Sequence, residues 1–135
     1  MSIYKQVAGA LAYKNGVKGE HLAEGFYAKI QYIKLHSRLK TKAGEIDLIF
    51  INTTQKHLIF TEVKTTSSNT AYIDYENLIS KLQWQRIFAA ADIFLNEAKQ
   101  SNADYADYTF SFDAVFIRND NIAHRVKNIF AEDVL

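Results

Sequence analysis

Two short apolar runs, residues 45–51 and 57–64, limit the folds that this chain can adopt. Both runs have large apolar side chains at odd and at even positions, which is typical of β-strands covered on both faces. The polar segment NTTQK between them predicts a hairpin. We therefore expect a sheet with a layer of structure on each side.

Charged side chains interrupt these runs: Asp47 in the first, and Glu62 and Lys64 in the second. Charges in a covered strand are costly unless they are paired, hydrogen-bonded or bound to a metal ion. A hairpin that closes with Asn52 opposite His57 places Asp47 directly opposite Glu62. Lys64 then follows on the same face. Because opposite residues have Cβ atoms about 5 Å apart, the three charged side chains are expected to converge.

Two roles are open to the carboxylates of Asp47 and Glu62. As close neighbours they repel each other unless a proton or a cation joins them, and oxygen ligands favour a hard ion, Mg²⁺ or Mn²⁺. A lysine beside such an ion can orient or help to deprotonate a water, which is the apparatus for hydrolysing a phosphodiester. The alternative is structural: Asp47 and Lys64 form a salt bridge, and Glu45 and Glu62 are solvated at the strand ends.

The remaining segments predict two helices and three further strands. Residues 16–30 place apolar side chains on one arc of a helix, and Gly19 lies in the middle of that arc, where a missing side chain permits close packing. A long helix is expected at 75–99. Further strands are expected at 32–37, 108–118 and 122–128. The order α-β-β-β-α-β-β indicates an α/β fold with a mixed sheet flanked by helices, in one domain over residues 1–135.

The long helix is apolar on two sides. One face carries Leu78, Ile79, Leu82, Ala89, Ala90 and Ile93, and a second stripe carries Trp84, Phe88, Ala91 and Leu95. The stripe of Trp84, Phe88 and Leu95 is either a homodimer surface or is covered by another segment of the chain. Arg86 lies within the first, core-facing arc, where a cation is unusual. It is expected to snorkel, to pair with Asp113 or to reach the site.

Composition excludes several classes of function. The chain has no cysteine, which removes disulfides and thiolate chemistry. The four histidines have no ligand spacing, so a zinc site is not expected. No apolar run approaches the roughly 20 residues of a membrane span, and we expect a cytoplasmic protein with no membrane partner.

Any binding of nucleic acid must be local, because the formal net charge is only +1. A basic run precedes the acidic pair, and a further cation opens the long helix. Such a run is either a solvated strand and turn or a patch that follows a phosphate backbone. The candidate nucleic-acid-binding residues are Lys34, Arg38, Lys40, Lys42, Lys81 and Arg86.

A series of short motifs resembles one known family. They are GVKGE at 16–20, GEIDLI at 44–49, EVK at 62–64, Lys81 and Phe112-Asp113. In this order and spacing they are similar to the YraN family of small bacterial proteins, a branch of the PD-(D/E)xK nuclease superfamily related to Holliday-junction resolvases. The resemblance covers about residues 15–130 and implies a restriction-endonuclease-like fold.

The resemblance also implies roles for particular residues. Asp47 and Glu62 would be metal ligands, with the Val63 carbonyl as a third, and Lys64 would be the catalytic lysine. Glu20, on the first helix, would complete or orient the site. The implied activity is Mg²⁺-dependent or Mn²⁺-dependent cleavage of DNA that is branched or contains single strands.

A second hypothesis is a catalytically inactive nucleic-acid-binding or scaffold protein on the same fold. The family commonly has arginine two positions after the motif lysine, where this chain has Thr66. A threonine there weakens a phosphate contact and leaves the core of the motif intact.

Overall fold

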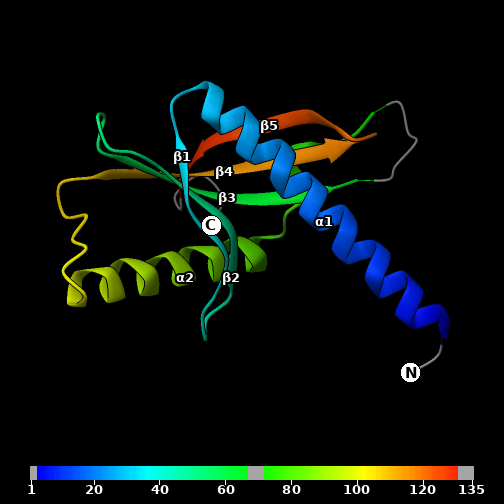
Figure 1. Ribbon diagram of the computed structural model, residues 1–135, viewed down its shortest axis with the longest axis horizontal. Helices are drawn as coiled ribbons and strands as arrows, with labels where there is room; N and C mark the ends of the chain where they lie inside the picture. The colour runs from blue at the N-terminus through cyan, green and yellow to red at the C-terminus, as the bar shows by residue number, and fades with distance from the viewer. Residues whose placement is uncertain (1–2, 67–71, 131–135) are drawn as a thin grey trace.

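The chain folds into a mixed β-sheet with a helix on each face (Figure 1). The computed structural model describes residues 3–66 and 72–130. The elements in chain order are α1 (Ile3–Lys29), β1 (Ile33–Lys40), β2 (Glu45–Asn52), β3 (His57–Thr65), the 3₁₀ turn η1 (Tyr75–Asn77), α2 (Lys81–Gln100), β4 (Thr109–Arg118) and β5 (Asn121–Ile129). The expected fold class and the order of the elements are confirmed.

The five strands are neighbours in chain order, β1-β2-β3-β4-β5. β3 and β4 run parallel, and the other neighbouring pairs are antiparallel. A parallel pair needs a crossover connection, and η1 and α2 supply it. In the hairpin of β2 and β3, Asn52 pairs with His57 and Leu48 pairs with Thr61. The predicted register is therefore confirmed over this ladder.

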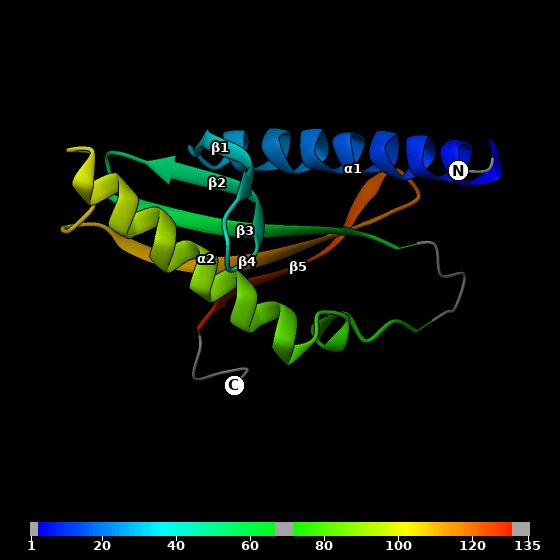
Figure 2. The same cartoon turned by 90° about the horizontal axis from the view of Figure 1, so that it is seen from below.

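The sheet is covered on both faces, as the apolar runs predicted. Figure 2 shows α1 on one side of the sheet and α2 on the other. The face toward α1 includes Leu48, Phe50 and Ile59, packed with Ala23 and Tyr27 of the helix. The larger cluster lies on the α2 face, with Ile46, Ile49, Leu58, Phe60 and Phe116 from the strands and Trp84, Ile87, Ala91 and Phe94 from the helix.

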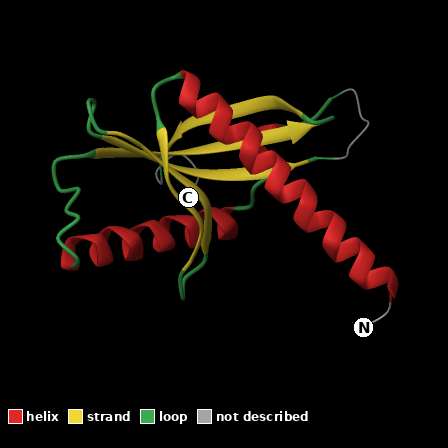
Figure 3. Cartoon of the chain, viewed as in Figure 1, coloured by secondary structure: helices red, strands yellow, loops and turns green. Residues whose placement is uncertain are grey.

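The first helix begins earlier than expected. α1 starts at Ile3 rather than near residue 16 and spans 27 residues, and its N-terminal turns extend past the sheet (Figure 3). The apolar arc recognised at 16–30 is the part of the helix that meets the sheet. Among the described residues, no helix combines the length and the apolar character that crossing a membrane requires.

The second helix packs with the opposite side from the one expected. The buried side chains of α2 are Trp84, Ile87, Ala90, Ala91 and Phe94, whereas Leu82 is 55% exposed. The prediction that Arg86 faces the core is therefore wrong: Arg86 is exposed, because the Trp84 stripe faces the sheet.

The same packing bears on the expected homodimer surface. Trp84 is 3% exposed, and Phe88 and Leu95 pack against the core of this chain. This burial favours the second alternative, in which another segment of the chain covers the stripe. A dimer through Trp84, Phe88 and Leu95 stays a prediction.

Gly19 packs directly against the sheet, as its place in the apolar arc predicted. A Cβ atom at Gly19 would lie 3.3 Å from side-chain carbons of Ile117 and Val63. We expect Gly19→Val to lower the free energy of unfolding by about 2 kcal/mol, since two further methyl groups have no room. Urea denaturation measures the change. Gly25→Val is the matched control, because nothing lies within 4 Å of a Cβ there, and equal stability of the two variants would contradict the tight packing.

Candidate active site

An open pocket of about 410 Å³ lies where β2 and β3 face the first turns of α2. Its lining includes both acidic residues of the hairpin that the sequence singled out, Asp47 and Glu62. It also includes Gly44, Glu45, Ser80, Leu82, Gln83, Arg86 and Ile87. At Gly44, a Cβ atom would lie 3.1 Å from the carbonyl oxygen and Cβ of Arg86. The missing side chain thus lets the helix approach the hairpin closely at the edge of the pocket.

The side-chain alternation of β2 is interrupted at Asp47. Ile46 and Ile49 both pack on the α2 face, whereas Leu48 and Phe50 pack on the α1 face. Residues 46 and 48 would share a face in a regular strand. Irregularities of this kind are common beside active sites, where they redirect a side chain.

The β2–β3 ladder also ends at this point. Its last backbone pair is Leu48 with Thr61, and Asp47 and Glu62 make no further pair in the ladder. Instead, the Asp47 carboxylate accepts a hydrogen bond of 2.8 Å from the backbone N–H of Val63. The expected juxtaposition of Asp47 and Glu62 is therefore made through side chains rather than through continued strand pairing.

Glu62 lies in an unfavourable environment for a negative charge. Burial, together with the charge of Asp47 and a hydrogen bond to it, raises the pKa of Glu62 to about 8, against an opposing effect of Lys64. One Glu62 oxygen also accepts a hydrogen bond of 2.8 Å from the side-chain amide of Gln83. Burial likewise raises the pKa of Asp47, and the nearby charge of Glu20 adds to this. The hydrogen bond between the two carboxyls lowers the pKa of Asp47 and raises that of Glu62, so the proton that joins the pair resides on Glu62.

The raised pKa of Glu62 predicts an unusual pH dependence of the stability of the protein. Between the ordinary pKa of about 4.5 and the raised pKa of about 8, folded Glu62 holds a proton that the unfolded chain releases. The metal-free protein should therefore lose stability as pH rises through this window. We expect Glu62→Gln to raise the free energy of unfolding by roughly 2 kcal/mol at pH 8 in EDTA, with little change at pH 5.

Urea denaturation at both pH values measures this difference. Glu97→Gln, at an exposed position on α2, is the control and should follow the unmodified chain at each pH. A Glu62→Gln variant that is less stable than the unmodified chain at pH 8 would contradict the strained pair.

Lys64 shares the α2 face with Glu62, but its ammonium does not bind Asp47. Lys64 Nζ donates a hydrogen bond of 3.3 Å to the carbonyl oxygen of Leu78. No ion pair within 4.0 Å joins Lys64 and Asp47, both of which are described. Glu62 is only partly exposed. The structural alternative, a salt bridge beside a solvated Glu62, is therefore wrong.

Glu20 reaches the same region from α1. It accepts hydrogen bonds of 3.0 and 3.2 Å from Nε of Arg38, and its charge contributes to the raised pKa of Asp47. Arg38 lies opposite Asp47 in the β1–β2 pairing, between the pairs Ser37–Leu48 and Leu39–Ile46, and has a positive φ of 52°. Glu20 thus acts on Asp47 through its charge and is held in place by Arg38. That Glu20 completes or orients the site stays a prediction.

The other predicted cations divide into three groups. Lys34 is paired with Glu24 at 3.3 Å, so part of the basic run joins β1 to α1. Arg86 lines the pocket, and Lys40 and Lys42 are exposed nearby in sequence. Lys81 is also exposed but lines a different pocket, on the other side of the α2 N-terminus. The structure therefore separates Lys81 from the acidic pair.

The sequence also held a signal for a residue that was not predicted. Gln83 lines the pocket and contacts Glu62. Ser80 is the N-cap of α2 and accepts a hydrogen bond of 3.1 Å from the backbone N–H of Gln83. The pattern Ser-x-x-Gln is a capping box, which would have started the helix at Lys81 rather than at 75 and placed Gln83 in its first turn.

The donors in the pocket suit a hard divalent ion. Asp47 and Glu62 provide two carboxyl groups whose shared proton a cation can replace. Within residues 3–66 and 72–130, no cluster of three or more His, Cys, Asp or Glu side chains forms a ready-made metal site. Two carboxylates completed by water or substrate oxygens match the way in which Mg²⁺ is usually held. The Val63 carbonyl as a third ligand stays a prediction.

Comparisons with known proteins identify the family. The family described as "Uncharacterised protein family UPF0102" matches residues 19–117, which include the acidic pair, Lys64 and Gln83. A UPF0102 protein of Acidiphilium cryptum is 30% identical over 122 residues, covering 90% of this chain and 88% of that protein. One from Rhodopseudomonas palustris is 33% identical over 108 residues (78% and 74%). A third, from Treponema denticola, is 30% identical over 109 residues (77% and 80%). The family-level resemblance is thus confirmed, and the chain belongs to the UPF0102 family.

Proposed function

We propose that this protein is a metal-dependent endonuclease that hydrolyses phosphodiester bonds in structured DNA. The observation that carries the proposal is the pair of carboxyl groups, Asp47 and Glu62, held together in an open pocket at a cost to the metal-free fold. A charge arrangement that destabilises a protein without a ligand is typical of a functional site. A divalent cation is the ligand that would remove this cost.

Each residue of the site has a definite task in this proposal. Asp47 and Glu62 would hold Mg²⁺ or Mn²⁺, which when bound lowers the pKa of a water and screens the charge of the phosphate. Gln83 fixes the orientation of Glu62 through its hydrogen bond. Glu20, held by Arg38, adds negative charge beside Asp47 and so favours binding of the cation.

Lys64 would act on the attacking water or on the phosphate. It follows Glu62 by two positions and shares its face of β3. Its hydrogen bond to the Leu78 carbonyl is 3.3 Å long, and an ammonium group has two further protons to donate. A bound phosphate can therefore engage Lys64 with a rotation of the flexible side chain.

The backbone of the substrate would lie along the cations near the pocket. Arg86 lines the pocket itself. Lys40, the last residue of β1, and Lys42, in the connection to β2, are both exposed. The net charge of +1 gives no long-range attraction for nucleic acid. We therefore propose recognition of DNA shape near the site, in branched or single-strand-containing DNA, rather than tight binding of any duplex.

A cleavage assay tests the proposal directly. The full chain is incubated with Mg²⁺ or Mn²⁺ and a panel of labelled DNAs: a four-way junction, a flap, a single strand and a plain duplex. We expect cutting of a branched or single-strand-containing substrate that EDTA stops and that Asp47→Ala abolishes. No cutting of any substrate, or cutting that survives Asp47→Ala, would overturn the assignment.

A second candidate is a DNA-binding protein without nuclease activity. The hydrogen bond of Lys64 to Leu78 favours it, because the ammonium is already engaged outside the acidic pocket. This candidate predicts that the protein binds the same DNA panel in a gel-shift assay and cuts none of it. Glu45→Gln and Arg86→Ala should then alter binding, while no metal supports cleavage.

A further inference from the structure

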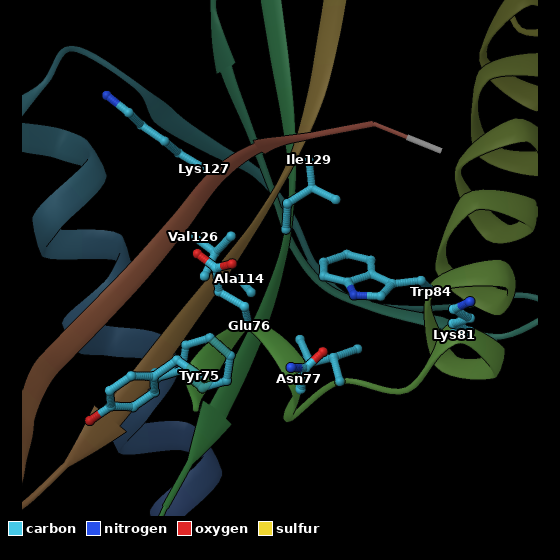
Figure 4. Close-up of a pocket in the computed structure, with 11 residues that line it drawn as sticks. Tyr75, Glu76, Asn77, Lys81, Trp84, Ala114, Val126, Lys127 and Ile129 are labelled. Carbon is cyan, nitrogen blue, oxygen red and sulfur yellow. The ribbon is translucent and has the colours of Figure 1, made fainter. Parts of the chain in front are cut away.

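A second cavity, of about 390 Å³, lies on the other side of the α2 N-terminus (Figure 4). Its walls come from η1, the first turn of α2 and strands β4 and β5. The lining combines polar and aromatic side chains. The rings of Tyr75 and Phe116 lie 5.1 Å apart, and Trp84 and Ile129 lie across the cavity from Tyr75 (Figure 4). Nothing in the proposed chemistry uses this cavity.

Trp84 gives the cavity a polar group that lacks a partner. The side chain is 97% buried, being 3% exposed, and its indole extends from α2 into the cavity (Figure 4). No acceptor in the described part of the chain contacts the indole N–H. The indole nitrogen is not among the fully buried atoms without a partner in the described part of the chain. The N–H can therefore be reached from the cavity and can donate to an acceptor on a planar ligand.

Two cations stand at the rim. Lys81 and Lys127 line the cavity and are exposed, and neither has an acidic group within 4.0 Å among the described residues. Glu76 is the one acidic residue among the lining residues. The side-chain amide of Asn77 donates a hydrogen bond of 2.6 Å to Asp74. The rim thus suits an anionic group attached to the planar one.

The two cavities share a wall. Ser80 and Gln83 face the acidic pocket, whereas Lys81 and Trp84 face the second cavity. Neighbouring residues of a helix are only about 3.8 Å apart along the chain. One nucleic-acid strand that passes over the α2 N-terminus can therefore reach both cavities with adjacent nucleotides.

We propose that the second cavity binds an unpaired base of a DNA strand whose neighbouring phosphodiester lies at the acidic pocket. This inference rests on the proposed nuclease function and specifies its substrate: DNA with at least one unstacked nucleotide beside the cleaved bond. The base stacks on the aromatic walls, a carbonyl oxygen or ring nitrogen of the base accepts from the Trp84 N–H, and Lys81 and Lys127 bind flanking phosphates. A base within an intact duplex would first have to unpair and unstack, which costs free energy, so a plain duplex is a poor ligand for this cavity.

Trp84 also provides the probe, because it is the only tryptophan in the chain. Its fluorescence is followed during titration of the Asp47→Asn variant in EDTA, so that binding is measured without cleavage. The ligands are an eight-residue oligothymidylate, an abasic oligomer of the same length, thymidine monophosphate and a blunt duplex. We expect saturable quenching by the oligothymidylate, at least about tenfold weaker binding of the monophosphate, and no quenching by the abasic oligomer or the duplex.

Paired lysine variants test the rim. Lys81→Ala with Lys127→Ala should weaken oligothymidylate binding at least tenfold, since two phosphate contacts are removed. The matched control, Lys29→Ala with Lys99→Ala, removes the same charge at exposed positions outside the cavity and should change affinity less than threefold. Glu76→Gln should tighten binding.

Several results would overturn the proposal. One is quenching by the abasic oligomer equal to that by the oligothymidylate, which would show that no base is bound. Another is equal affinity for the monophosphate and the oligothymidylate, which would make the cavity a site for a free nucleotide. No quenching under conditions where anisotropy of a labelled oligomer shows saturation would also overturn it. Because these assays need neither metal nor turnover, their outcome is separate from that of the cleavage assay.

Discussion

Replacing Lys64 by methionine should lower the rate of metal-dependent DNA cleavage at least about 100-fold while leaving metal binding intact. Methionine keeps the length and apolar stem of the side chain and removes the ammonium that would act on water or phosphate. Loss of a group that moves or holds a proton in the transition state typically costs about 10² to 10⁴ in rate. The acidic pair, which would hold the ion, is untouched by this change.

The comparison with Asp47→Asn separates the two roles. That variant should lose both cleavage, by at least about 1000-fold, and the rise in melting temperature that Mg²⁺ or Mn²⁺ gives the unmodified chain, because one metal ligand is gone. Melting temperatures with and without metal, measured beside cleavage rates, make the distinction. A Lys64→Met variant that cuts at the normal rate would assign the lysine to its hydrogen bond with Leu78 alone.

The largest effect on stability is expected at Asp113. This carboxylate is fully buried and accepts hydrogen bonds from the Tyr27 hydroxyl at 2.5 Å and from Arg125 at 2.8 and 3.0 Å. The guanidinium of Arg125 also lies over the rings of Phe26 and Tyr27, 5.2 Å from each centroid. The network joins α1, β4 and β5, so Asp113 anchors the structure.

Asp113→Ala should therefore lower the free energy of unfolding by about 3–5 kcal/mol, because it leaves a half-buried guanidinium and a buried hydroxyl without their acceptor. Adding Arg125→Met should recover part of the loss by removing the uncompensated charge. Asp107→Ala is the control: its carboxylate is exposed and paired with Lys56 on the surface, and a much smaller change is expected. Urea denaturation of the three variants measures these free energies of unfolding. An equal loss of stability in Asp107→Ala would contradict the role of burial.

Local patterns predicted the scaffold of the site well. The two-sided apolar runs of β2 and β3 required cover on both faces, and α1 and α2 provide it. The short polar connection between the strands fixed their register, which pairs Asn52 with His57. Pattern and turn length act within a few residues of each other, so they can be read without knowing the rest of the fold.

The partners of the charged side chains were not predictable in the same way. Lys64 binds a carbonyl of the segment before α2, Gln83 holds Glu62, and Arg125 rather than Arg86 meets Asp113. The first two contacts depend on how α2 and the segment before it pack on the sheet, and the third depends on which side chains of β5 lie beside Asp113.

The sequence by itself thus determined the order of the elements, the hairpin register and the presence of Asp47, Glu62 and Lys64 on neighbouring strands. Only the tertiary structure decided that α2 turns its Trp84 stripe to the sheet, which exposes Arg86 and opens a cavity on each side of the helix start. The physical reason is that a helix with two apolar sides has two nearly equivalent ways to pack. The choice between them is made by complementary shape, such as the contact of Gly44 with Arg86.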